Sequence, residues 1–141
     1  MHEETLVAPA PPVLPEVKVF WDGTTEGKLL LPWCAACQAG WWYPRAFCPR
    51  CGSLEVAWVP ASGRGTVYSY TVCRRGQADL PEYRGVDTFV LAYVELEEGP
   101  RVMTNVVDCE PGAVRIGQAV EVVFHPAAEC AALYRFRPSG A

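Results

Sequence analysis

The sequence has little of what an enzyme active site uses. Histidine occurs only twice, as His2 near the start and as His125 at the end of an apolar run. No Ser-His-Asp arrangement, glycine-rich phosphate loop or pair of carboxylates with catalytic spacing is present, and acid–base or nucleophilic catalysis needs such groups. A free-standing hydrolase is therefore disfavoured. We expect a binding or scaffolding protein that is not an enzyme on its own, with no catalytic residues.

Long apolar runs are also missing. No stretch reaches the roughly 18 apolar residues that can span a bilayer. The chain begins Met-His-Glu-Glu, which is acidic where a signal peptide would be basic, and Pro9, Pro11, Pro12 and Pro15 interrupt the stretch that follows. These features predict a cytoplasmic protein with no membrane partner.

An excess of positive charge is absent as well. The chain has 12 basic and 16 acidic residues, a net charge of −4 and a pI of about 5.2. Its densest basic cluster is the pair Arg74-Arg75. Because a nucleic-acid-binding domain needs a basic face to displace counterions from phosphates, the composition argues against a nucleic-acid partner.

Two Cys-x-x-Cys pairs, Cys34/Cys37 and Cys48/Cys51, are the most informative feature that is present. Pairs at this spacing bring four thiolates to the corners of a tetrahedron, the geometry that Zn²⁺ prefers in closed structural sites. Gly52 directly follows the second pair and lets the backbone turn with positive φ, so that N–H groups point at the sulfurs. We predict a zinc ribbon with one Zn²⁺ per chain.

Disulfides or a redox pair are the alternative interpretation of these cysteines. Disulfide scaffolds belong to secreted chains, and seven cysteines cannot all pair. The other three, Cys73, Cys109 and Cys130, share no motif, and Cys73 is expected to be a small buried hydrophobic residue. We therefore expect four thiolates on the metal and three reduced cysteines.

Composition divides the chain into three segments. Residues 1–15 are rich in proline and alanine and predict a linker or tail that is stiffened toward polyproline II. Residues 16–59 are expected to form a short amphipathic helix that ends near Gly27, followed by the ribbon with strands at 29–31 and 55–59. Residues 60–138 are expected to form a separate β domain.

The third segment alternates apolar and polar residues in several short runs. These runs, rich in β-branched and aromatic residues, lie at 65–72, 88–96, 101–107, 116–124 and 133–136. The turn at 97–100 predicts a hairpin between the second and third runs. The fold class is therefore mainly β: an N-terminal helix, a ribbon and a five-stranded OB-fold barrel. A β-sandwich is the alternative, although five strands make a thin one.

Five aromatic residues crowd around the cysteines. They are Trp33, Trp41, Trp42, Tyr43 and Phe47. A ribbon has almost no interior, because its metal substitutes for a core, and each aromatic side chain brings about 150–250 Å² of surface that favours burial. In one interpretation all five attach the ribbon to the barrel. In the other, which we favour, part of the set forms an exposed protein-interaction patch.

With these residues in place, the chain resembles the acyl-CoA-associated zinc-ribbon/OB-fold proteins, a family long labelled as of unknown function. The matching stretches are Phe20-Trp21, Pro44-Arg45, Cys48-Pro49-Arg50-Cys51-Gly52, 62–72, 94–99, 116–117, 120–124 and 136–138. The resemblance covers about residues 16–138, and the combination is specific although no single stretch is. One departure is Gln38, where a glycine commonly follows the first cysteine pair; it leaves every ligand in place.

The resemblance implies a rubredoxin-like ribbon and a role beside a thiolase-superfamily enzyme, an aldolase or acyltransferase, in a hetero-oligomer that shares an acyl-CoA at the interface. Some members of the family are fused behind a hot-dog-fold hydratase domain, and the proline-rich start of this chain would suit such a fusion. In bacterial steroid side-chain degradation, a member pairs with an aldolase that releases propionyl-CoA. A zinc-ribbon nucleic-acid or transcription-type module is the alternative, which the net charge disfavours.

Coenzyme A carries phosphates, which arginine side chains bind well. The candidates are Arg45, Arg50, Arg64, Arg74 and Arg75. Arg64 is favoured because it lies between Gly63 and Gly65, where the backbone can be approached closely. The other interpretation is that each is a solvated surface charge.

Overall fold

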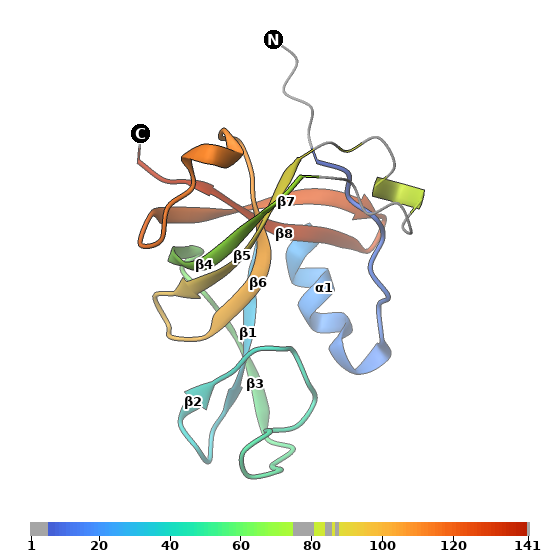
Figure 1. The fold of residues 1–141 in the computed structure, drawn as a ribbon. Helices are drawn as coiled ribbons and strands as arrows, with labels where there is room; N and C mark the ends of the chain where they lie inside the picture. Colours follow the sequence, from blue (N-terminus) through green and yellow to red (C-terminus); the bar gives the residue numbers. More distant parts are fainter. Residues whose placement is uncertain (1–5, 75–80, 84–85, 87, 141) are drawn as a thin grey trace.

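The computed structural model describes residues 6–74, 81–83, 86 and 88–140. A closed five-stranded barrel lies above a small three-stranded sheet, and one helix packs beside their junction (Figure 1). This is the mainly β architecture that the sequence predicted, with one short N-terminal α-helix. None of the helices in the described ranges has the length and apolar character that crossing a bilayer requires.

The helix follows the proline-rich segment. A 3₁₀ turn, η1, spans Pro15–Val17, and the helix α1 spans Lys18–Thr25. Proline suits the first helical turn because its φ is already helical and its missing N–H would have no partner there. The buried face of α1 includes Phe20 and Thr24. The Thr24 Oγ1 accepts a hydrogen bond from the backbone N–H of Ala132 at 3.0 Å, which ties the helix to the barrel.

The ribbon is an antiparallel sheet in the order β2-β1-β3, made of β1 (Leu30–Cys34), β2 (Ala39–Gly40) and β3 (Val56–Pro60). Strand β1 extends beyond the predicted 29–31, because Cys34 pairs with Ala39 on one side and with Val56 on the other. The first cysteine is therefore held within the sheet.

The barrel consists of β4 (Arg64–Cys73), β5 (Phe89–Leu96), β6 (Arg101–Val106), β7 (Ala119–Ala128) and β8 (Ala131–Pro138). Its order is β4-β5-β6-β8-β7, and β4 closes the barrel by pairing with β7. The contact between β6 and β8 is parallel and has a single register pair. This connectivity is that of an OB fold, which excludes the sandwich alternative. Two further 3₁₀ turns, η2 (Pro81–Tyr83) and η3 (Pro111–Ala113), lie in the connections.

In the barrel, β7 and β8 also differ from the predicted strands. Strand β7 begins at Ala119 rather than at 116, because Gly117 has a φ of 85° and forms a turn whose N–H donates to the carbonyl of Val67 at 2.8 Å. Strand β8 is longer than 133–136, because it pairs with β7 from Pro138 back to Ala131.

Cys73 is less buried than the sequence predicted, and a β-bulge in β4 explains the difference. The register shifts between Val67 and Ser69, which moves Tyr70 and Val72 to the core side of the strand. Cys73 is left half-buried at the end of β4.

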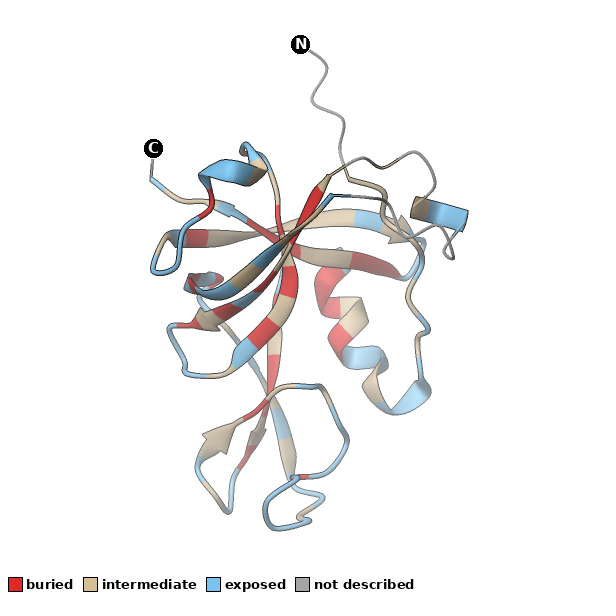
Figure 2. Ribbon diagram, viewed as in Figure 1, coloured by how far each residue is buried: buried red, intermediate tan, exposed pale blue. Residues whose placement is uncertain are grey.

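The core fills the barrel and continues beneath α1 toward the ribbon (Figure 2). Alternating residues of β5 and β6 face inward, among them Val90, Val94 and Val102. Phe20 of α1 and Leu31 of β1 belong to the same cluster. The helix therefore joins ribbon and barrel through one continuous hydrophobic core.

The described part of the N-terminal segment lies against the barrel. Arg135 on β8 is 1% exposed, and its guanidinium donates to the carbonyl of Leu6 at 2.7 Å and to the carbonyl of Val7. The same group lies 2.9 Å from Nδ1 of His125 on β7. A buried guanidinium thus anchors the beginning of the described chain.

Candidate functional site

The four cysteines of the predicted ribbon come together at one end of its sheet. Their sulfur atoms all lie within 4.8 Å of one another. The distance is 3.7 Å between Cys34 and Cys51 and 3.9 Å between Cys37 and Cys48. Four sulfurs placed tetrahedrally at about 2.3 Å from one ion would be about 3.8 Å apart, so the cluster fits a four-thiolate metal site. These distances exceed the roughly 2.05 Å of a disulfide bond, and all four cysteines are thiols.

The first cysteine pair is held by a tight turn. The N–H of Cys37 donates to Sγ of Cys34 at 3.4 Å, and the N–H of Gln38 donates to the carbonyl of Cys34 at 2.8 Å. Gln38 has a φ of 53°, the left-handed conformation for which glycine is the usual residue. Its side-chain Nε2 donates to the carbonyl of Ala35 at 2.6 Å, which helps hold that conformation. The turn therefore keeps its shape without the glycine.

The second pair lies in a matching turn. The N–H of Arg50 donates to Sγ of Cys48 at 3.4 Å, and the N–H of Gly52 donates to the carbonyl of Cys48 at 2.9 Å. Backbone N–H groups of Cys51 and Arg50 lower the pKa of Cys48 to about 7. The Cys37 thiol donates hydrogen bonds to Cys51 and then Cys48, which stabilise its neutral form and raise its pKa to about 12. Cys48 therefore forms a thiolate more readily than Cys37, and a bound cation would favour the thiolate form of every ligand.

The cysteine cluster is buried on one side and exposed to solvent on the other. Cys34 and Cys48 are buried beneath Trp41, whereas Cys37 is half-buried and Cys51 is exposed. Solvent therefore reaches the cluster on one side only.

The aromatic residues of the ribbon separate into buried and exposed members. Trp41 is buried against the cysteines, Trp42 is half-buried in the core, and Trp33 is half-buried beside Gly40. Tyr43 and Phe47 are 51% and 46% exposed. Of the five aromatic residues, only these two project substantially into solvent. The other three are wholly or partly buried and help to hold the ribbon in place, so part of the set attaches the ribbon and part is exposed.

Trp42 belongs to an aromatic cluster at the junction of ribbon, helix and barrel. Its ring lies 5.3 Å from Phe20 and 5.2 Å from Tyr134, both edge to face. Trp21 joins the cluster at 5.0 Å from Phe20. Burial raises the pKa of Tyr134 to about 12, with a smaller contribution from Tyr43. Sequence reasoning missed Tyr134, although it lies in the apolar run at 133–136.

The candidate arginines do not form one site. Arg45 and Arg50 are exposed in the loop between β2 and β3, which carries the second cysteine pair. Arg64 begins β4 and Arg74 follows its last residue, so about 30 Å of strand separates the two. Arg75 lies outside the described residues.

The glycines beside Arg64 serve the barrel. A Cβ atom at Gly63 would lie 2.7 Å from Val122 Cγ1, and one at Gly65 would lie 2.5 Å from the carbonyl oxygen of Glu95. These contacts give both glycines a role in packing the barrel. Arg64 itself pairs with Glu97 at 3.2 Å. Arg45 and Arg50 form no ion pair with any residue that the structure describes.

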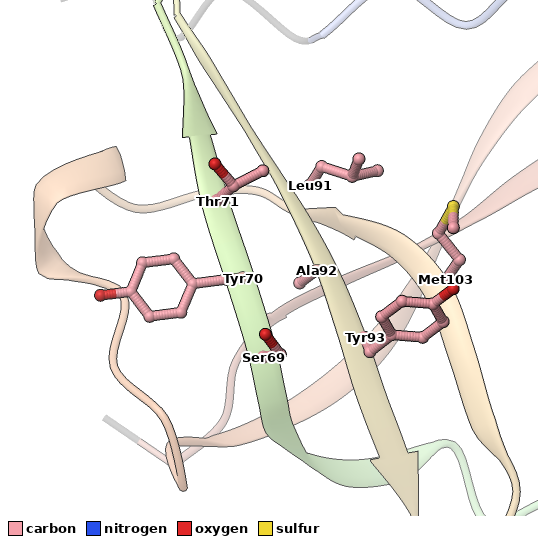
Figure 3. A pocket seen from close by; sticks show the side chains of 7 residues that line it. All are labelled: Ser69, Tyr70, Thr71, Leu91, Ala92, Tyr93 and Met103. Carbon is pink, nitrogen blue, oxygen red and sulfur yellow. The ribbon is translucent and has the colours of Figure 1, made fainter.

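A shallow groove of about 190 Å³ lies on the outside of β4, β5 and β6 (Figure 3). Its lining includes Ser69 and Thr71 from β4, Leu91 and Tyr93 from β5, and Met103 from β6. Tyr93 pairs directly with Ser69 and Met103 across the strands. OB folds commonly bind ligands on this face. Sequence reasoning missed the groove, although the period-two pattern puts Leu91 and Tyr93 on one side of their strand.

Comparison with known proteins gives a consistent result. Residues 21–57 match the profile of the rubredoxin-like zinc ribbon domain of ChsH2, and residues 58–125 match that of the ChsH2 C-terminal OB-fold domain. In a solved structure of the Ltp2-ChsH2(DUF35) aldolase, one chain is 32% identical and superposes with a TM-score of 0.79, over 93% of this chain and 100% of that chain.

Three relatives with curated names span different roles. A DUF35 domain-containing scaffold protein of Methanothermobacter thermautotrophicus is 37% identical, over 68% of this chain and 71% of that protein. A probable enoyl-CoA hydratase alpha subunit of Thermomonospora curvata is 35% identical, over 91% of this chain but only 39% of its own length. The benzoylsuccinyl-CoA thiolase subunit BbsA of Geobacter metallireducens is 34% identical, over 56% of this chain and 50% of that protein.

Proposed function

This chain belongs to the ChsH2 family of DUF35 proteins, in which a rubredoxin-like zinc ribbon precedes an OB-fold domain, and we propose that it is the non-catalytic scaffold subunit of an acyl-CoA-processing enzyme complex. The observation that carries the proposal is the match to the whole length of a chain in the Ltp2-ChsH2(DUF35) aldolase. The shortage of catalytic groups in the sequence supports the same conclusion.

The proposed partner is a thiolase-superfamily enzyme, an aldolase or an acyltransferase. The solved relative is a chain of the Ltp2-ChsH2(DUF35) aldolase, and two other relatives are named as subunits of a thiolase and of a hydratase. The names of these two subunits both refer to a CoA thioester, with different acyl groups. We therefore propose a CoA thioester, with no particular acyl group, as the substrate class of the complex that contains this chain. Retro-aldol release of propionyl-CoA from a steroid side chain is the specific reaction that we propose to test first. A hot-dog-fold hydratase, fused or associated, is a further proposed partner.

We propose that Cys34, Cys37, Cys48 and Cys51 hold one Zn²⁺ per chain. The sulfur–sulfur distances and the all-thiolate donor set suit this ion. With four protein ligands the ion would have no open position. Its contribution would be to order the ribbon, and no chemical step would pass through it.

The proposed docking surface on the ribbon consists of Tyr43, Phe47 and Leu54, which we call the ribbon patch. Leu54 is 81% exposed, the highest value among the large apolar residues described. Arg45 and Arg50 lie in the same loop, and aromatic residues with arginine are the side chains enriched at protein interfaces. Trp33, Trp41 and Trp42, the other three aromatic residues near the cysteines, serve mainly to hold the ribbon in place. We further propose that Arg45 and Arg50 approach the CoA phosphates beside this patch.

Co-expression with candidate thiolase-superfamily enzymes tests the proposal. We expect a stable complex, and the double variant Tyr43→Ala/Phe47→Ala should raise its Kd by about thirtyfold or more, because one interfacial aromatic anchor commonly contributes about 2 kcal/mol. Ile116→Ala is the control, since Ile116 is 70% exposed at the turn before β7. If Tyr93→Ala weakens the complex and the ribbon variant does not, the partner docks on the barrel groove. If no candidate binds, the scaffold proposal is wrong.

A further inference from the structure

Trp41 covers the buried side of the cysteine cluster. Its side chain is 9% exposed and packs with Cys34 and Cys48, beside the half-buried Cys37 and Val56. These residues form a small core of their own, separate from the barrel core. Trp41 is the only aromatic residue in it among those described. Its position beside the two least accessible sulfurs is therefore specific.

The indole N–H of Trp41 has no acceptor in the described part of the chain, and its nitrogen is inaccessible to solvent. Leaving a buried donor without an acceptor is unfavourable, because the group loses its hydrogen bonds to water on folding. Apart from the indole nitrogen itself, the polar side-chain atoms of this small core are sulfurs. A sulfur bound to a cation carries negative charge and accepts hydrogen bonds more strongly than a neutral thiol.

Two backbone N–H groups already donate hydrogen bonds to the sulfurs of Cys34 and Cys48. The N–H of Cys37 donates to Cys34 and the N–H of Arg50 donates to Cys48, both at 3.4 Å. Groups that donate to the ligands of a metal commonly alter its affinity by about 10- to 100-fold. The Trp41 indole N–H donates to neither sulfur in this structure, but its ring packs with the same two cysteines, so a rotation of the indole toward either sulfur would add a third donor.

We propose that, in the metal-loaded protein, the Trp41 indole donates a hydrogen bond to the sulfur of Cys34 or Cys48 and, with its ring, keeps water from the buried half of the site. Trp41 is then a positioning residue that slows metal release, and release begins at the exposed Cys51. This inference rests on the proposed zinc site.

The test compares Trp41→Phe with Trp42→Phe in the full chain. The neighbouring Trp42 also has a buried N–H without an acceptor among the described residues, but its ring packs against Phe20 and Tyr134. We expect Trp41→Phe to transfer zinc to excess chelator about tenfold faster than wild type. In the Co²⁺-substituted variant, the sulfur-to-metal charge-transfer bands should move to lower energy, because the thiolate loses a hydrogen bond. Trp42→Phe should match wild type in both measurements.

A measurement on the unsubstituted protein covers the case in which Trp41→Phe does not fold. In protein loaded with ¹¹³Cd²⁺ and labelled with ¹⁵N at tryptophan, we expect scalar coupling between the metal and one indole proton, assigned to Trp41. The inference would be overturned if the metal binds without that coupling. It would also be overturned if Trp41→Phe releases zinc at the wild-type rate and has the wild-type Co²⁺ spectrum. Either result would leave the zinc proposal standing. If the wild-type chain binds no metal, both proposals fall.

Discussion

Arg135 is the largest fully buried side chain of the described structure. A buried cation needs partners, and here the guanidinium donates to the backbone carbonyls of Leu6 and Val7 and contacts His125. Burial lowers the pKa of Arg135, an effect that Tyr83 opposes. No carboxylate within the described ranges pairs with it. The proline-rich segment is therefore part of the folded structure from Leu6 onward.

His125 makes this contact depend on pH. Burial, and then the charge of Arg135, lower its pKa below the ordinary 6.5, while Asp108 opposes the shift. The folded state therefore binds fewer protons than the unfolded state. The contribution of His125 to stability is present above about pH 6.5 and is lost as the pH falls through the lowered pKa.

We expect the free energy of unfolding of wild type to fall more steeply between pH 7 and pH 5 than that of His125→Asn, whose Oδ1 can accept the bond from Arg135 without titrating. Denaturant unfolding at each pH measures this difference. The comparison also separates His125 from the acid sensitivity that a thiolate metal site adds to both proteins. Parallel profiles for the two proteins would contradict the assignment.

At the scale of elements, neither α1 nor the ribbon is stable by itself. A helix of eight residues is too short to persist in water, so α1 depends on its buried Phe20 and on the bond between Thr24 and Ala132. The ribbon has its own small core of two buried cysteines and Trp41. Its sheet can be ordered by the metal and by Trp42, which attaches it to the aromatic cluster at the junction.

Removing one ligand should therefore unfold the ribbon and spare the barrel. We expect Cys48→Ser to lose zinc, because structural zinc sites contribute on the order of 10 kcal/mol to ordering their domains at neutral pH. Amide spectra should then show lost dispersion for residues near 28–59 and unchanged peaks for the barrel strands. Cys130→Ser is the control, since Cys130 is exposed in the turn between β7 and β8. Full zinc content in Cys48→Ser would reject the ligand assignment.

At the scale of the whole molecule, the exposed aromatic residues of the described chain lie on the ribbon and on the barrel. Tyr43 and Phe47 belong to the ribbon patch, whereas Tyr68 and Tyr93, which are 47% and 43% exposed, lie on β4 and β5, and Tyr93 lines the barrel groove. Arg101 lies 3.8 Å above the Tyr68 ring and pairs with Glu95, so its charge is already engaged. The arginines beside the ribbon patch have no such partner in the described chain. We therefore expect an anionic ligand shared with a partner to bind at the ribbon.

In the reconstituted complex, Arg45→Ala and Arg50→Ala should each raise KM for the acyl-CoA by about tenfold, equivalent to about 1.4 kcal/mol, with little change in kcat. Loss of a phosphate contact weakens binding without touching the reacting atoms. Arg137→Ala is the matched control, because Arg137 is an exposed arginine paired with Glu121 on the barrel. If Arg64→Ala alone raises KM, the phosphates lie at the start of β4. Unchanged kinetics in all of these variants would make the chain a purely structural partner.

The sequence by itself determined the features that depend on local spacing. Two Cys-x-x-Cys turns predict a tetrahedral cluster because each turn positions its own sulfurs, and the sulfur–sulfur distances agree. Alternating runs predicted the five strands, since inward and outward side chains alternate along a strand whatever its neighbours are. The predicted strand boundaries were wrong in two situations. The turn at Gly117 decides where β7 begins, and pairing with β7 decides the length of β8.

Only the tertiary structure decided which of these residues face solvent and which meet one another. Trp41, Trp42 and Tyr43 are consecutive, yet one covers the cysteines, one joins the barrel core and one is exposed. Arg135 contacts Leu6 across almost the whole length of the chain, and no local pattern marks that pair. The physical reason is that burial depends on which surfaces pack together. That packing is a property of all the elements at once, whereas spacing along the chain specifies each element alone.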